Sequence, residues 1–177
     1  LPHLIQHLGI DDGQVLLSTN KVDAIQLAGM YNAADFTVNI SDAEGFGLST
    51  LESLSCGTPI IVNMTGGLQE QVTDGKKWFG WGIQPSSKSV IGSLQVPYIY
   101  EDRISQKEFT ETLKKALNIS KKAYNKMSRD GLKHVETNYS FKNYIQGWTD
   151  IMDSIVEKHG SWETRNNYER WQLLEVA

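Results

Sequence analysis

The chain has 177 residues, of which 40% are hydrophobic and 21% are charged, and its formal net charge is -4. This length and apolar content fit one α/β domain with a single core, and lysines scattered among acids exclude a basic stripe for nucleic acid. The single cysteine, Cys56, excludes an internal disulfide and any site built from several cysteines; a small buried residue on a helix end is the expected role.

The first elements are short. Residues 4–8 are expected to form the end of a helix, and residues 10–13 (Ile-Asp-Asp-Gly) a turn. Val15, Leu16 and Leu17 form a brief apolar run, which predicts a first strand. Apolar residues then recur at helical spacing, so that a helix is predicted over residues 24–34 with Asp23 as its cap.

A strand–helix–strand pattern follows. Residues 36–40 and 59–63 are β-branched and apolar and predict two strands, and residues 49–56 between them predict a helix. Gly57 stands where a helix C-terminus favours a left-handed residue, with Pro59 beyond it. Strands that alternate with helices through short connections predict a parallel sheet with helices on its faces, in which ligands bind beyond the carboxyl ends of the strands.

The second half of the chain divides into a loop region and helices. Residues 74–105 are rich in glycine and aromatics and are expected to be irregular, with the aromatics more often covering the sheet edge than binding a ligand. Apolar stripes predict core-packed helices near residues 109–117, 123–132 and 144–155, with Ser140 as a cap and Gly160 as an end. Residues 161–177 predict a short amphipathic C-terminal helix.

The most informative stretch lies between residues 42 and 67. Glu44 begins a glycine-broken loop and is followed, after seven residues, by Glu52. The loop should present backbone N–H groups at a helix start, where unpaired donors and the helix dipole attract phosphate. Glu44 would then accept hydrogen bonds from sugar hydroxyls and Glu52 from a ribose diol. The residues that line this predicted site are Gly45, Phe46, Gly47, Leu48, Ser49 and Thr50, with Lys21 near the base.

Each of these residues also has a structural interpretation. Ser49 and Glu52 match a capping box, and Glu44 matches an ordinary solvated acid. Thr50 would add a hydroxyl to the site or face solvent. The pair Gly66-Gly67 would admit a sugar or make a tight turn, two readings of equal weight, and a solvated role is the better one for Lys21.

The order of these motifs resembles the retaining glycosyltransferases of family 4, the group 1 glycosyl transferases. The resemblance rests on the Glu44–Glu52 spacing, on residues 56–59 (Cys-Gly-Thr-Pro), on Gly66-Gly67 and on the small-small-Asp step that ends at Asp35, and it extends to about Trp148. It implies a GT-B fold of two Rossmann-like domains, of which this chain is the C-terminal, donor-binding half. Residues 1–160 would form that domain, and residues 161–177 would pack back toward an N-terminal acceptor domain that is absent.

The resemblance also implies the activity. The enzyme would move a hexosyl group from a nucleoside diphosphate sugar to an acceptor hydroxyl and keep the anomeric configuration, with no metal or other cofactor. The family's basic Arg and Lys pair for the diphosphate is absent, because all four arginines lie downstream of the motif, so the chain by itself is expected to be inactive.

Two alternatives remain beside this function, a nucleotide-sugar epimerase of the same architecture and a non-catalytic nucleotide-sugar or partner-binding module. The chain has no apolar stretch of about 20 residues and no leader-like start, which predicts a cytoplasmic location. Peripheral membrane contact would come through the absent domain. The expected partners are therefore the nucleotide-sugar donor, an acceptor glycan, lipid or protein, and the N-terminal domain, with no nucleic acid.

Overall fold

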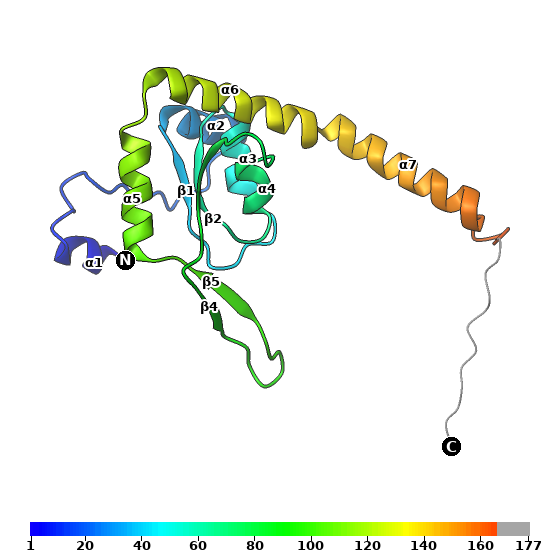
Figure 1. The fold of residues 1–177 in the computed structure, drawn as a ribbon, viewed down its shortest axis with the longest axis horizontal. Coiled ribbons are helices and arrows are strands. Elements are labelled where there is room, and N and C mark those ends of the chain that lie inside the picture. Colours follow the sequence, from blue (N-terminus) through cyan, green and yellow to red (C-terminus); the bar gives the residue numbers. More distant parts are fainter. Residues whose placement is uncertain (166–177) are drawn as a thin grey trace.

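The computed structural model describes residues 1–165, which form an α/β body from which a hairpin and a long helix extend (Figure 1). The elements run in the order α1 (Pro2–His7), α2 (Ala24–Ala33), β1 (Thr37–Asn39), α3 (Leu48–Ser55), β2 (Ile60–Asn63), α4 (Leu68–Val72), β3 (Gly80–Ile83), β4 (Ser87–Val90), β5 (Tyr100–Arg103), α5 (Gln106–Leu117), α6 (Lys121–Asn138) and α7 (Phe141–His159).

The main sheet contains three parallel strands in the order β1-β2-β3. Thr37 pairs with Ile60, and Ile60 pairs with Gly80 on its other side. All four residues of β2 are buried, as expected for a central strand that is covered by helices on both faces. The fold is a Rossmann-like parallel sheet flanked by helices, and the strands predicted near residues 36–40 and 59–63 are confirmed.

The core has one layer on each face of the sheet. The layer beneath α3 and α4 contains the buried residues Leu54, Ile60, Val62, Leu68, Val72 and Phe79. The layer beneath α5 contains Ile61, Ile83 and Ala116, with Phe36, Trp81, Phe109 and Leu113 packed against it. The apolar stripe predicted near residues 109–117 is therefore confirmed as core, except for Leu117, which is 76% exposed.

Several predicted helix ends are confirmed. Asp23 caps α2 in a capping box with Gln26, and the Ser140 side chain accepts from the N–H of Asn143 at the start of α7. Gly57, which follows α3, has φ of 77°, and Gly160 ends α7 with φ of 76°. Because only glycine adopts such angles at little cost, both positions terminate their helices where the sequence indicates.

The strand predicted at Val15–Leu17 is wrong. These residues lie in an exposed coil between α1 and α2. Among residues 1–165 the parallel sheet contains β1, β2 and β3, and Val15–Leu17 pairs with none of them. A strand without a partner leaves its backbone groups to water, so the apolar run stays irregular.

The prediction that residues 74–105 are irregular is also wrong. They contain β3, which completes the parallel sheet, and the antiparallel hairpin of β4 and β5. The glycines that suggested a loop have a packing reason instead, since a Cβ on Gly80 would lie 1.8 Å from the carbonyl oxygen of Ile60. Phe79 is buried in the core, as the covering role predicts, but Tyr98 and Tyr100 on the hairpin are exposed.

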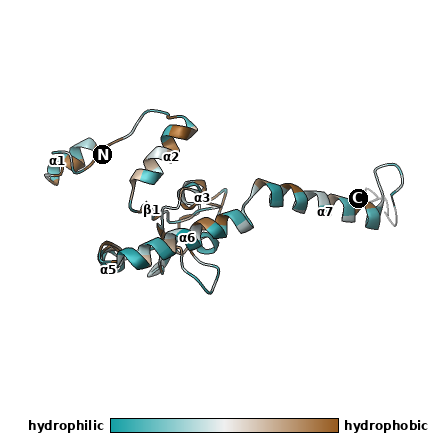
Figure 2. Cartoon of the chain, turned by 90° about the horizontal axis from the view of Figure 1, so that it is seen from above, coloured by the Kyte–Doolittle hydropathy of each residue, from teal (hydrophilic) through white to brown (hydrophobic). Residues whose placement is uncertain are grey.

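Helix α7 forms where it is predicted, but its predicted role as core is wrong. Its large apolar side chains are between 46% and 74% exposed, namely Phe141, Tyr144, Ile145, Trp148, Ile151, Met152, Ile155 and Val156. The helix extends away from the body, with apolar segments along its surface (Figure 2). Helical spacing shows only that one face is apolar, and here no described element covers that face. The helix predicted for residues 161–177 begins with a turn at 161–165, and the rest lies outside the described residues.

No helix among residues 1–165 combines the length and hydropathy needed to cross a bilayer.

Candidate functional site

The predicted loop connects the carboxyl end of β1 to the N-terminus of α3. Gly47 is the residue before α3 and has φ of 84° and ψ of 64°, and no side chain caps the helix. A Cβ at Gly47 would lie 2.6 Å from Leu68 and 2.8 Å from the Thr50 hydroxyl, so this glycine is required. The space around Gly45 is open. The first-turn N–H groups of α3 are consequently left without a side-chain acceptor at this edge of the sheet.

The capping box predicted from Ser49 and Glu52 is not formed, because Gly47 and not Ser49 precedes the helix. Glu52 instead accepts a hydrogen bond of 3.0 Å from the Tyr31 hydroxyl of α2. Burial, followed by this hydrogen bond to the carboxylate, raises the pKa of Tyr31 from 10.0 to about 12. Glu52 remains exposed, so Tyr31 orients a carboxylate that is still open to a ligand.

Thr50 does not face solvent, since its side chain is fully buried. Its hydroxyl lies 2.6 Å from Gln71 Oε1 and 2.8 Å from the Gly47 carbonyl oxygen. The Gln71 amide in turn donates to the carbonyl oxygen of Phe46 at 2.6 Å. Thr50 and Gln71 therefore hold the loop against α4 from inside the protein. The Thr50 side chain supports the site but does not face it.

The pair Gly66-Gly67 is explained by packing between two loops. A Cβ on Gly66 would lie 1.6 Å from the Glu44 carbonyl oxygen, and one on Gly67 would lie 2.8 Å from the Phe46 carbonyl oxygen. Gly66 also has φ of 46°. The two loops at the carboxyl ends of β1 and β2 are thus interlocked, with the Glu44 backbone seated on Gly66.

Glu44 is half-buried at the outer end of this loop. Its carboxylate lies 3.5 Å from the Asn39 side-chain amide, a weak contact. The other end of that amide, Asn39 Oδ1, accepts from the backbone N–H and the hydroxyl of Ser41, at 3.1 and 2.8 Å. Asn39 therefore orders the turn that carries Glu44 and leaves the carboxylate available to hydroxyl donors.

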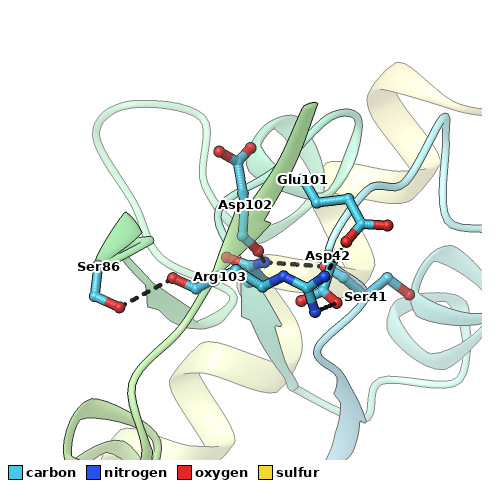
Figure 3. A network of polar contacts seen from close by, with 7 residues as sticks. Ser41, Asp42, Ser86, Glu101, Asp102 and Arg103 are labelled. Carbon is cyan, nitrogen blue, oxygen red and sulfur yellow. Dashed lines mark hydrogen bonds and ion pairs between the residues drawn. The ribbon is translucent and has the colours of Figure 1, made fainter. Parts of the chain in front are cut away.

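Two basic residues, Lys21 and Arg103, differ in their position relative to the loop. Lys21 is exposed in the coil before α2, and the contacts that hold the loop come from other residues. Arg103 reaches the loop from β5, but its guanidinium is paired with two carboxylates, Asp42 at 2.6 Å and Glu101 (Figure 3). An anion at the N-terminus of α3 would accordingly meet backbone donors first.

A cavity of about 590 Å³ borders the other side of the loop. It is lined by Phe46, Leu51, Asn138, Tyr139, Phe141, Asn143 and Tyr144, and by neither glutamate of the motif. Its walls belong largely to α6 and α7, and Phe141 and Tyr144 are themselves well exposed. Because the two carboxylates and the open helix end lie outside it, we place the candidate site on the loop and not in this cavity.

Sequence reasoning missed the residues that support the motif: Tyr31, Asn39, Gln71, Asp102 and Arg103. Their partners lie between 5 and 61 positions away in the chain, and no spacing rule links them. Of these residues, Asn39 is the one that the sequence indicates, because it is the last residue of β1 and lies at the carboxyl edge of the sheet.

The comparisons with known proteins agree with this fold. The family model described as Glycosyl transferases group 1 matches residues 1–134. A D-inositol 3-phosphate glycosyltransferase 2 of Catenulispora acidiphila is 42% identical over 105 residues, which is 58% of this chain and 24% of that protein. A D-inositol 3-phosphate glycosyltransferase of an Arthrobacter species is 41% identical over 76 residues, 43% of this chain and 18% of that protein. The chain thus spans about a quarter or less of these relatives.

Solved structures share the architecture. Sucrose-phosphate synthase from Thermosynechococcus elongatus superposes with a TM-score of 0.67 at 21% identity, over 88% of this chain and 33% of that one. The C-terminal domain of a glycosyl transferase group 1 family protein from Francisella tularensis gives a TM-score of 0.57 at 21% identity, over 79% of this chain and 60% of that one. At this identity the likeness concerns the fold alone.

Proposed function

Because the chain belongs to the group 1 glycosyltransferases, we propose that it holds the nucleoside diphosphate sugar donor of a retaining glycosyl transfer. In this reaction a sugar passes from the donor to an acceptor hydroxyl, and its anomeric configuration is kept. The chain would act together with an N-terminal acceptor domain. The names of the relatives contain D-inositol 3-phosphate, so this compound is the first to test as the acceptor here.

The observation that carries this proposal is the open N-terminus of α3. A left-handed glycine starts the helix without a side-chain cap, so its first N–H groups and the positive end of the helix dipole point to one place. A diphosphate satisfies both features. Helix ends of this kind bind phosphate in other dinucleotide-binding folds, at the same carboxyl edge of a parallel sheet.

The two carboxylates would bind the two ends of the donor. Glu44 precedes the helix and would accept hydrogen bonds from hydroxyls of the transferred sugar. Glu52, held by Tyr31 from α2, would accept from the ribose diol. A carboxylate with two acceptor oxygens suits a pair of neighbouring hydroxyls better than a single donor.

The proposed chemistry is electrostatic. Negative charge develops on the departing diphosphate, and fixed N–H donors at a helix start stabilise it without reorganisation. Glu44 orients the sugar so that the acceptor hydroxyl meets the anomeric carbon, which lowers the entropic part of the barrier. We propose no covalent nucleophile and no metal ion.

The test is calorimetric titration of the chain with UDP-, GDP- and ADP-sugars and with the corresponding free nucleotides. Glu52→Ala should weaken sugar nucleotide and free nucleotide alike, by about tenfold for one lost charge-assisted contact. Glu44→Ala should weaken mainly the sugar-bearing form. If both substitutions leave every affinity unchanged, the assignment of the site is wrong. Full-length enzyme with radiolabelled donor then separates transfer from epimerisation by its product.

A further inference from the structure

The β4–β5 hairpin leaves the body at the same edge as the two site loops. β3 is parallel to β1 and β2, so its carboxyl end lies beside theirs, and the hairpin follows after only three residues. Figure 1 shows the hairpin projecting from this end of the sheet. The loop after β1, the turn after β2 and the base of the hairpin are therefore neighbours, although they span residues 41 to 103.

The hairpin base binds the first loop by backbone and side chain. The backbone N–H of Asp102 donates to the carbonyl oxygen of Asp42 at 2.7 Å. The guanidinium of Arg103 donates to the Asp42 carboxylate at 2.6 Å and also contacts Glu101 (Figure 3). These contacts fix Asp42, which lies two residues before Glu44.

Asp102 of the hairpin also binds the turn after β2. The Asp102 carboxylate accepts a hydrogen bond of 2.8 Å from the hydroxyl of Thr65, which is 5% exposed. The carbonyl oxygen of Asp102 accepts one of 2.8 Å from the side chain of Asn63, and that amide also donates to the Ser41 carbonyl oxygen at 3.0 Å. Asn63 is completely buried, so its two donated bonds join all three segments inside the protein.

The buried part of this network carries more weight than its exposed ion pair. Arg103 and Asp42 are 44% and 35% exposed, and water and salt screen such a pair. The bonds from Asn63 and Thr65 are shielded, and loss of one partner would leave a buried polar group unsatisfied. Asn63 Oδ1 has no partner among the described residues, so the two bonds donated by Nδ2 are the ones that hold this amide.

We propose that Asp102 and Arg103 are positioning residues of the donor site, and that the hairpin base clamps the loop of Glu44 to the turn of Gly66. We call the set Asp42, Asn63, Thr65, Asp102 and Arg103 the hairpin clamp. This inference rests on the proposed function for its ligand. The clamp acts on both sides of one contact, because Glu44 lies against Gly66, the residue after Thr65.

Hydrogen exchange of the unliganded chain tests the clamp without any ligand. Thr65→Val should speed exchange in peptides covering residues 42–50 by about tenfold, the factor for loss of one such contact, and Arg103→Ala should speed it by a smaller factor, because its exposed ion pair is screened. Thr65→Ser keeps the hydroxyl and should restore slow exchange. Leu94→Ser is the matched control, since Leu94 is 99% exposed at the hairpin tip and outside the clamp. Unchanged exchange in Thr65→Val, or an equal rise in Leu94→Ser, overturns the clamp.

Titration with UDP-, GDP- and ADP-sugars then tests its role at the site. Thr65→Val should weaken the sugar nucleotide about tenfold, and Thr65→Ser should restore the affinity. Full affinity in Thr65→Val with fast exchange would overturn the positioning role. If the unaltered chain binds none of the probes, the proposed function fails and the donor role fails with it, whereas the exchange result still decides whether the clamp exists.

Discussion

The loop of residues 41–47 and helix α7 are both conspicuous in the sequence, and they differ in where their partners lie. The loop is held on several sides within this chain, by Gly66, Gln71, Asn39 and the hairpin base. Helix α7 has a long apolar face of which every large side chain is about half exposed or more. A pattern in sequence thus predicts that an element will have a preferred face, but not whether the chain itself covers that face.

The largest effect is expected from a substitution that forces the loop of Glu44 away from the turn of Gly66. Gly66→Ala should lower the free energy of unfolding by about 3 kcal/mol, because its Cβ would overlap the Glu44 carbonyl oxygen at a φ of 46°. Urea unfolding measures this. Gly29→Ala is the control, since the space around Gly29 within α2 is empty and alanine favours a helix. An equal loss in both variants would contradict the interlocked loops.

The pin beneath the loop should give a smaller effect. Gln71→Ala removes a buried side chain that bonds both Thr50 and the Phe46 carbonyl oxygen, and should lower the free energy of unfolding by about 2 kcal/mol. Gln69→Ala, two positions away on the exposed side of α4, should change it by less than about 0.5 kcal/mol. Similar values for the two glutamines would show that Gln71 does not hold the loop.

The bond between Tyr31 and Glu52 has a signature in pH. The raised pKa of Tyr31 means that the folded state favours the neutral phenol, so the related stability is complete below pH 10.0 and is lost as the pH rises toward about 12. Glu52→Gln should lower the Tyr31 pKa only part of the way back toward 10.0, because burial is the larger cause of the raised pKa.

Tyrosinate absorbance measures this shift. The chain has seven tyrosines, so the Tyr31 signal is taken as the difference from a Tyr31→Phe variant. A Tyr31 pKa that does not respond to Glu52→Gln would mean that the two side chains are not paired in solution.

The smallest effect is expected on α7. Ile151→Ser should change the free energy of unfolding by less than about 0.5 kcal/mol, because the side chain is half exposed and no described element packs on it. Leu54→Ala in the core should cost about 2 to 5 kcal/mol in the same assay. A large loss from Ile151→Ser would show that α7 folds onto the body of this chain.

Much of the body could be predicted because its signals are local. A few neighbouring residues are enough to predict the helix caps at Asp23 and Ser140, the helix end at Gly57 and the strand near residues 59–63. The strand at Val15–Leu17 fails because a short apolar run does not show whether a sheet edge is available to pair with it. Strand β3 was missed because its two glycines are dictated by tertiary neighbours, Gly80 by the carbonyl oxygen of Ile60 and Gly82 by the side chains of Met64 and Trp78.

The site was predictable only in its outline. The glycine loop and the two glutamates can be recognised from spacing, and the left-handed Gly47 has the expected role at the helix start. The supporting contacts join residues far apart in the chain, such as Asp42 with Arg103 and Glu52 with Tyr31, and depend on strand order and loop packing. Thr50 shows the limit of spacing arguments, since its hydroxyl faces Gln71 inside the protein and not the site.

We propose that the N-terminus of α3 receives the donor diphosphate. NMR of the ¹⁵N-labelled chain during titration with UDP-, GDP- and ADP-sugars tests this. We expect the largest amide shifts at residues 47–50, and we expect inorganic pyrophosphate to reproduce them and Glu52→Ala not to abolish them. Shifts centred on the cavity of Phe46, Tyr139 and Tyr144, with residues 47–50 unmoved, would contradict it.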